Sequence, residues 1–175
     1  VSANTSLIKL HCSGNFPYGN PTSNLDVSSN TALTELDCSE NDLPTLDLSQ
    51  NTSLIYLNCS SNDLPTLDLS QNTSLTYLDC SRSLVLTVLD VSANTAIEYL
   101  DCHDNLLNSL DVSNKPSLIY LYCNDNQITA LDVSQSSDLI ELNCNGNQLT
   151  NLDVKNGNNT NFIFFKSNEN PNLTC

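Results

Sequence analysis

Cysteine recurs at an almost constant interval along this chain of 175 residues. Seven of the eight cysteines are separated by 26, 21, 21, 22, 21 and 21 residues. They are Cys12, Cys38, Cys59, Cys80, Cys102, Cys123 and Cys144. A fixed period of about 20 to 50 residues is the signature of an array of stacked units, so this repeat constrains the fold more than any other feature of the sequence.

The same phrase surrounds each cysteine. It reads L-x-x-L-x-C-x-x-N-x-L-x-x-L-D-L/V-S-x-N, and the copies at 33–53 and 54–74 are nearly identical. Its L-x-C segment alternates apolar residues with a period of two, which predicts a short strand with both of them on the buried face. The rest of each unit is too short for a long helix and is crowded with Pro, Asp and Ser, so we expect short strands or 3₁₀ turns there.

The repeat predicts one domain over 1–175. Regular copies run over 7–161, 1–6 is the remnant of a preceding copy, and 162–175 is a degenerate copy that caps the C-terminal end. Two copies contain additional residues: five near "NFPYGNPTSN" and one in 82–87, which puts Ser83 or Leu84 where a recurring Asn belongs. We expect both insertions to bulge outward without shifting the strands, so that Cys12 and Cys80 keep their places.

The recurring cysteines are predicted to be reduced and buried. Equivalent residues on parallel in-register strands lie about 4.8 Å apart with side chains pointing the same way, whereas a disulfide needs Cβ atoms about 3.8 Å apart. A column of thiols fills space as small hydrophobic groups do. It offers no tetrahedral cage, and no C-x-x-C occurs, so no zinc site is expected. Cys175 lies outside the column.

Two polar columns accompany the cysteines. Asp26, Asp47, Asp68, Asp90, Asp111, Asp132 and Asp153 each precede Leu or Val, and an Asp there can accept backbone N–H groups two or three residues on and so close a turn. Calcium binding by this column is the less favoured alternative, because the glycine-rich nonapeptide of calcium-binding β-helices is absent. Asn15, Asn41, Asn62, Asn105, Asn126 and Asn147 form a ladder expected to satisfy backbone groups between units.

The phrase resembles the leucine-rich repeat, with cysteine at a position usually held by an apolar core residue. The 21-residue unit, the recurring cysteine and the "LDVSxNT" segment are most similar to internalin-like bacterial surface proteins. This resemblance implies a right-handed solenoid with a parallel β-sheet on its concave face, short strands or 3₁₀ turns on its convex side and little α-helix. It also implies an exported, non-enzymatic adhesion or interaction module that binds a protein partner through the concave face.

Charge excludes other classes of partner. With 20 acidic and 5 basic residues the formal net charge is -15, so neither nucleic acid nor an anionic membrane surface is expected to bind. No apolar run approaches the roughly 18 residues that a membrane-spanning helix needs. His11 and His103 are four units apart, roughly 19 Å, and cannot form a catalytic dyad or share a metal ion. We therefore expect no catalytic residue, metal or cofactor.

The variable positions of the strands carry the candidate binding site. Residues that flank the second Leu point outward, and five of the six tyrosines fall among them. The predicted site consists of Tyr56, Tyr77, Asp79, Tyr99, Asp101, His103, Tyr120 and Tyr122. Tyrosine also simply suits a sheet surface, but it anchors partners well, and an acidic border favours a basic protein partner. A cell-surface glycan is the second ligand class, and a passive spacer that displays other domains is the alternative role.

Overall fold

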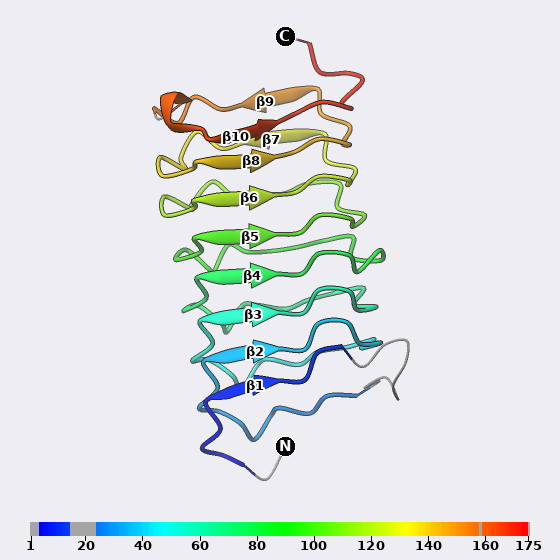
Figure 1. Cartoon of the computed structure of the whole chain (residues 1–175), viewed down its shortest axis with the longest axis vertical. Helices are drawn as coiled ribbons and strands as arrows, with labels where there is room; N and C mark the ends of the chain where they lie inside the picture. The colour runs from blue at the N-terminus through cyan, green and yellow to red at the C-terminus, as the bar shows by residue number, and fades with distance from the viewer. Residues whose placement is uncertain (1–3, 15–23, 158, 175) are drawn as a thin grey trace.

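The protein is described by a computed structural model over residues 4–14, 24–157 and 159–174, which form a stack of coils (Figure 1). Eight three-residue strands make one sheet in the order β1-β2-β3-β4-β5-β6-β8-β10. They are β1 (Lys9–His11), β2 (Glu35–Asp37), β3 (Tyr56–Asn58), β4 (Tyr77–Asp79), β5 (Tyr99–Asp101), β6 (Tyr120–Tyr122), β8 (Glu141–Asn143) and β10 (Phe164–Lys166). Every neighbouring pair is parallel and in register, so equivalent residues of successive coils lie side by side.

The opposite side of the stack is built from less regular segments, and few of them form strands. There β7 (Ala130–Asp132) pairs with β9 (Asn151–Asp153) in a second, two-stranded sheet. In the described ranges the helical content is one 3₁₀ turn, η1 (Asn159–Asn161), and these residues include no helix long and apolar enough to cross a membrane. The predicted fold class, a parallel β-solenoid of the leucine-rich-repeat type with essentially no helix, is confirmed. We call the solvent side of the eight-stranded sheet the concave face and the opposite side the convex face.

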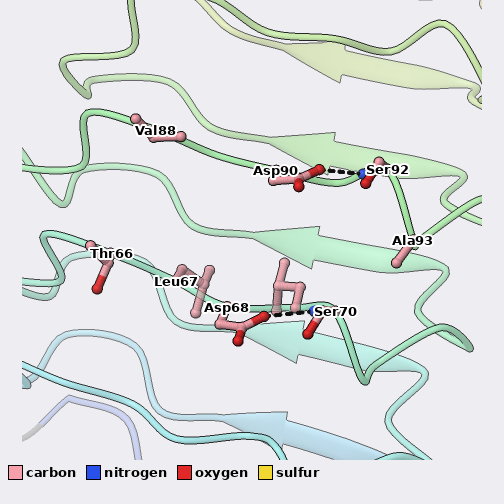
Figure 2. Close-up of a pocket in the computed structure, with 9 residues that line it drawn as sticks. Thr66, Leu67, Asp68, Ser70, Val88, Asp90, Ser92 and Ala93 are labelled. Carbon is pink, nitrogen blue, oxygen red and sulfur yellow. Dashed lines mark hydrogen bonds between the residues drawn. The ribbon is translucent and has the colours of Figure 1, made fainter.

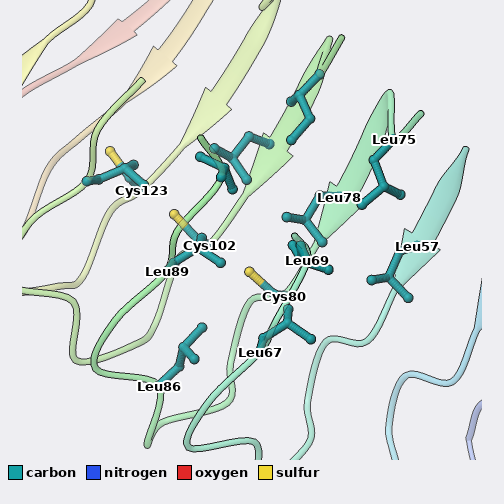
Figure 3. Close-up of a cluster of buried hydrophobic side chains, with 14 of the residues drawn as sticks. Leu57, Leu67, Leu69, Leu75, Leu78, Cys80, Leu86, Leu89, Cys102 and Cys123 are labelled. Atoms are coloured by element: carbon teal, nitrogen blue, oxygen red, sulfur yellow. The ribbon is translucent and has the colours of Figure 1, made fainter. Parts of the chain in front are cut away.

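Leucine and cysteine fill the space between the two faces (Figure 3). Leu57 and Leu78 enter from the strands, Leu67 and Leu89 from the convex side, and all four are buried. Cys38, Cys59, Cys80, Cys102, Cys123 and Cys144 are fully buried free thiols, as predicted. The expectation that all seven columnar cysteines are buried is wrong for Cys12, which is only half-buried because it lies in the first coil, at the end of the column.

The asparagine ladder is confirmed at the predicted positions that the structure describes. Asn62 is typical: its Nδ2 donates to the carbonyl oxygens of Cys38 and Cys59, both at 3.0 Å, and its Oδ1 accepts the N–H of Leu43 at 3.0 Å. Asn15 lies outside the described residues. The degenerate last copy extends the ladder with Asn170, which the sequence pattern did not predict.

A second asparagine column stabilises the other edge of the stack. Nδ2 of Asn51 donates to the carbonyl oxygens of Val27 and Asn30, at 3.0 and 2.9 Å, and Asn72 and Asn94 repeat this arrangement in the next two coils. Lys115 takes the equivalent position one coil further and is 1% exposed. Burial lowers the pKa of its ammonium group, against the opposing effect of Asp111 and Asp90.

The insertion in 82–87 stays on the rim, as predicted. Ser83 takes the ladder position and is buried, while the neighbouring Leu84 is 66% exposed and has a φ of 58°. β4 pairs in register with both β3 and β5, so Cys80 remains in its column. The insertion at "NFPYGNPTSN" falls almost entirely on 15–23, outside the described residues.

Candidate functional site

The predicted site residues lie together on the concave face. Register pairing aligns four tyrosines in one column on β3 to β6: Tyr56, Tyr77, Tyr99 and Tyr120. Two residues further along β4 to β6, it aligns Asp79, Asp101 and Tyr122 in a second column. His103 follows β5 by two residues. The five tyrosines are half-buried rather than fully exposed, which the sequence did not predict.

Three of these tyrosines form a continuous stack along the sheet. The ring centroids of Tyr56 and Tyr77 are 4.3 Å apart with planes at 14°, and those of Tyr77 and Tyr99 are 4.3 Å apart with planes at 6°. The rings therefore cover one another's faces and turn mainly their edges and hydroxyl groups toward solvent. A flat sugar face would find little open ring surface here.

The stack ends at Tyr99. Its ring is tilted by 48° to Tyr120 and by 57° to Tyr122, with centroids 5.9 and 5.8 Å apart. Tilted pairs leave parts of the ring faces uncovered. The aromatic surface open to a partner is thus concentrated at β5 and β6.

At the ends of most strands of the concave face, an Asp carboxylate or an Asn amide closes the turn that follows. Asp79 Oδ1 accepts both the backbone N–H and the hydroxyl of Ser81, at 3.0 and 2.7 Å, and closes the turn that leaves the strand. Asp37 with Ser39, and Asn58 with Ser60, repeat this pattern. Burial raises the pKa of Asp79, while the bonds from Ser81 oppose that change.

This turn pattern is altered at β5 and abandoned at β6. His103 replaces the serine, and its backbone N–H and Nδ1 both bond Asp101 Oδ1, at 3.1 and 2.6 Å. In the next coil Tyr122 stands where the Asp or Asn acceptor belongs, followed by Asn124. A repeat that departs from its own stabilising pattern indicates a position selected for something other than the fold.

A shallow hollow lies at this departure, with a volume of about 340 Å³. It is lined by Tyr99, Asp101, His103, Tyr122, Asn124 and Asn143. We call it the β5–β6 notch. Four of the six lining residues were predicted; Asn124 and Asn143, joined by a 2.9 Å hydrogen bond, were missed. Asn124 replaces the usual serine, and that departure was visible in the sequence.

Charge in the notch centres on Asp101, which is 8% exposed. Its Oδ2 accepts a long bond from the Tyr99 hydroxyl at 3.4 Å. The hydrogen bond to Asp101 raises the pKa of His103, with burial acting in the opposite direction. Arg82 approaches the far side of the ring, with Nε 3.2 Å from Nε2 of His103.

The convex face has a hollow of about 290 Å³ between two coils (Figure 2). In it, Asp68 and Asp90 each accept the backbone N–H of the serine two residues on, at 2.9 and 2.8 Å. All seven predicted aspartates of this column accept the N–H two residues on, which confirms the turn-closing role. The hydrogen bonds lower the pKa of Asp68 and Asp90. This hollow follows from the repeat, so it is the weaker candidate.

The described ranges contain no group of three or more His, Cys, Asp or Glu side chains that could hold a metal ion. His11 lies on β1, where its Nε2 contacts Glu35 at 2.6 Å, far from His103 on β5.

Comparison with solved structures finds the same architecture. The functional domain of InlJ from Listeria monocytogenes, described as including a cysteine ladder, is 34% identical with a TM-score of 0.82, over 99% of this chain and 46% of that one. A leucine-rich repeat protein of Leptospira interrogans is 20% identical with a TM-score of 0.73, over 98% of this chain and 54% of that one. The chain thus spans about half the length of these two structures.

The ectodomain of the plant receptor kinase GASSHO1/SCHENGEN3 from Arabidopsis thaliana, solved in complex with CASPARIAN STRIP INTEGRITY FACTOR 2, is 20% identical with a TM-score of 0.71. That likeness covers 96% of this chain and 22% of the receptor. At such identities the likeness concerns the fold alone. Neither protein-family models nor curated proteins give a match to the sequence.

Proposed function

Since the chain is a leucine-rich repeat protein with a cysteine ladder, resembling InlJ, we propose that it is a non-enzymatic module that binds a protein partner through its concave face. The observation that carries this proposal is the departure at β5 and β6. There Tyr122 displaces a turn-closing Asp or Asn, and the tyrosine stack opens. Large amphipathic aromatic side chains beside polar groups are typical anchors of protein interfaces.

The stacked tyrosines favour a protein over a glycan. Sugar recognition by aromatic residues uses open ring faces, whereas Tyr56, Tyr77 and Tyr99 cover one another. Their hydroxyl edges suit the backbone and polar side chains of a protein. The formal net charge of -15 favours a partner whose contact surface is basic.

We also propose that the protein is exported to a bacterial cell surface, where it serves adhesion or another surface interaction. The resemblance of the repeat to those of internalin-like bacterial surface proteins supports this location. The buried thiols are compatible with an oxidising environment, because disulfide exchange requires an accessible thiolate. The fully buried cysteines, such as Cys80 and Cys102, have pKa values raised well above the ordinary one by burial.

The test is capture of purified candidate surface proteins by the immobilised chain. Wild type is compared with a Tyr99→Ala, Tyr122→Asn double variant and with Gln71→Ala. Gln71→Ala is a matched control on the convex face, because Ala93 occupies the same position one coil further. We expect a specific protein to bind wild type and Gln71→Ala, and to bind the double variant at least about tenfold more weakly, since a central aromatic anchor contributes about 2 kcal/mol or more.

Each other outcome has a distinct meaning. Equal binding by all three chains rejects the concave face as the site. Binding on a glycan array without any protein partner indicates a carbohydrate-binding module. No ligand in either screen, together with intact surface function in the double variant, indicates a spacer that displays other domains.

A further inference from the structure

The β5–β6 notch holds a carboxylate that is nine-tenths buried. Asp101 Oδ1 is engaged by His103, whereas Oδ2 accepts only the long 3.4 Å bond from Tyr99 among the described residues. Ordinary carboxylates can accept about four hydrogen bonds. Oδ2 therefore retains acceptor capacity on the side that faces the notch residue Tyr99.

Above the pKa of His103, the partner of Oδ1 is a neutral ring. Arg82 Nε carries a hydrogen and lies 3.2 Å from His103 Nε2, so in this arrangement Nε2 accepts and the ring hydrogen resides on Nδ1, which donates to Asp101. A neutral imidazole does not cancel the charge of a carboxylate. A buried carboxylate without a cation is costly, and a cationic ligand would offset that cost.

The rings beside this carboxylate are suited to a cation. The Tyr99 and Tyr122 centroids are 5.8 Å apart at 57°, so the rings do not cover each other as the stacked tyrosines do. The Tyr122 hydroxyl donates to Glu141 Oε2, so a second carboxylate lies beside the hydroxyl group of this ring. Aromatic faces combined with carboxylates are the usual surroundings of a bound guanidinium or ammonium group.

We propose that the β5–β6 notch receives one arginine or lysine side chain of a protein partner, with its stem against Tyr99 and Tyr122 and its N–H groups directed at Asp101 Oδ2. This inference rests on the proposed function and adds the chemistry of the contact. Asn124 and Asn143 complete the wall with amide groups.

Protonation of His103 opposes this binding. The charged groups around the ring are Asp101, Asp104 and Arg82, with Asp79 on the neighbouring strand β4. Once protonated, the ring pairs with Asp101 as a cation and its Nε2 no longer accepts from Arg82. A cationic ligand is therefore bound best above the pKa of His103, which Asp101 raises from the ordinary value of 6.5.

The test is a titration followed by amide chemical shifts, with N-acetyl-arginine amide as the probe and N-acetyl-citrulline amide as its uncharged counterpart. At pH 8.5 we expect the arginine probe to shift Tyr99, Asp101, His103 and Tyr122 with saturation, and the citrulline probe to bind at least about tenfold more weakly. Arginine binding should weaken at pH 5.5. This comparison uses the wild-type chain and needs no variant to fold.

Two variants and one control variant then test the assignment of the site. Tyr122→Asn installs the residue found at the equivalent Asn58 and Asn143 and should abolish the arginine response, while Gln71→Ala should keep it. His103→Ser installs the repeat's usual serine and should bring the ratio of the arginine affinity at pH 8.5 to that at pH 5.5 close to one. Equal chemical-shift changes with both probes would reject the notch as a binding site for a cationic side chain. Chemical-shift changes that are spread over the acidic surface and are unchanged in Tyr122→Asn would reject it as well.

The two proposals fail separately. A protein captured through the concave face without any preference of the notch for arginine over citrulline removes the notch inference and leaves the proposed function. Arginine binding in the notch without any protein partner for the concave face removes the proposed function and leaves the notch as a cation-binding site.

Discussion

Ser83 follows Asn62 in the ladder beside the cysteine column but does not reproduce its hydrogen bonds. Asn62 Nδ2 bridges the carbonyl oxygens of Cys38 and Cys59, whereas the buried hydroxyl of Ser83 has no hydrogen-bond partner among the described residues. A buried polar group without a partner costs about 1–3 kcal/mol. The coil that carries Ser83 is therefore a weak point of the stack.

Replacing Ser83 by Asn should raise the free energy of unfolding by about 1 kcal/mol. Its Nδ2 would donate to the carbonyl oxygens of Cys59 and Cys80, as Asn62 does to those of Cys38 and Cys59. Urea denaturation measures the change, with Asn126→Ser as a control that should destabilise. A lower midpoint for Ser83→Asn would mean that the inserted Leu84 leaves no room for the amide.

The residue before each ladder position provides a second prediction. Glu40 has a φ of 52° there and Gly146 has a φ of 61°. The left-handed region costs a residue with a side chain about 1–2 kcal/mol more than glycine. Glu40→Gly should therefore raise the free energy of unfolding by about 1 kcal/mol. The greater conformational entropy of glycine in the unfolded chain reduces this gain.

Gly146→Ala is the matched reverse change. It adds a Cβ that meets the Asp125 side chain at a positive φ, so it should destabilise. Thermal unfolding of both variants tests the pair. Shifts of the same sign would show that backbone strain at this position does not decide stability.

Much of the fold could be predicted because the repeat itself encodes it. Period-two alternation places Leu57 and Cys59 on the same buried face, and a shared copy length forces parallel in-register pairing, as between Leu57 and Leu78. The turn-closing role of Asp68 follows from short-range chemistry within one coil. These inferences needed no knowledge of side-chain conformation.

The second asparagine column could not be read in the same way. Asn51 looks like an ordinary turn residue in sequence, and its purpose appears only because the Asn30 carbonyl lies one coil away. Burial of Lys115 at that position was likewise not visible. Contacts between coils depend on which edge of the stack a residue reaches, which the one-dimensional pattern does not state.

The sequence predicted which residues lie together on the concave face, but not how their side chains pack. Register alone brings Tyr99, Asp101 and Tyr122 together. That Tyr56 and Tyr77 cover each other, and that Asp79 is committed to Ser81, depend on side-chain conformations. These conformations are the reason why we propose a contact centred on the notch rather than on the tyrosine column.

The tyrosine stack should contribute to stability as well as to the surface. Tyr77 stacks on two neighbours, and each aromatic pair contributes about 0.5–1.5 kcal/mol. Tyr77→Ala should destabilise by about 1–3 kcal/mol and Tyr56→Ala, which loses one stacked pair, by about half as much. Denaturant titration with tyrosine circular dichroism measures both. Equal losses of unfolding free energy in the two variants would show that stacking adds little to stability.

The cysteine column predicts that the protein loses stability in mild alkali. Burial raises the thiol pKa of Cys144 to about 12 and those of Cys59, Cys80, Cys102 and Cys123 well above the ordinary value. Burial raises that of Cys38 as well. In the unfolded chain each thiol loses its proton near pH 8.5, whereas the folded chain retains it. The unfolded state then binds fewer protons than the folded state. The free energy of unfolding therefore has its full value below about pH 8.5 and falls as the pH rises toward the thiol pKa values of the folded chain.

The expected decline is steep. Each retained proton contributes about 1.4 kcal/mol per pH unit, so six buried thiols give a slope of about 8 kcal/mol per pH unit once all six ionise in the unfolded chain. Urea midpoints measured under reducing conditions between pH 7 and 10 test this. Cys102→Ala should reduce the slope by about one sixth, although the cavity it leaves lowers stability at every pH. A free energy of unfolding that stays constant from pH 8 to 10 would contradict the column of buried thiols. Thiols give no pH dependence of stability only when they lose their protons at the same pH in the folded and the unfolded chain.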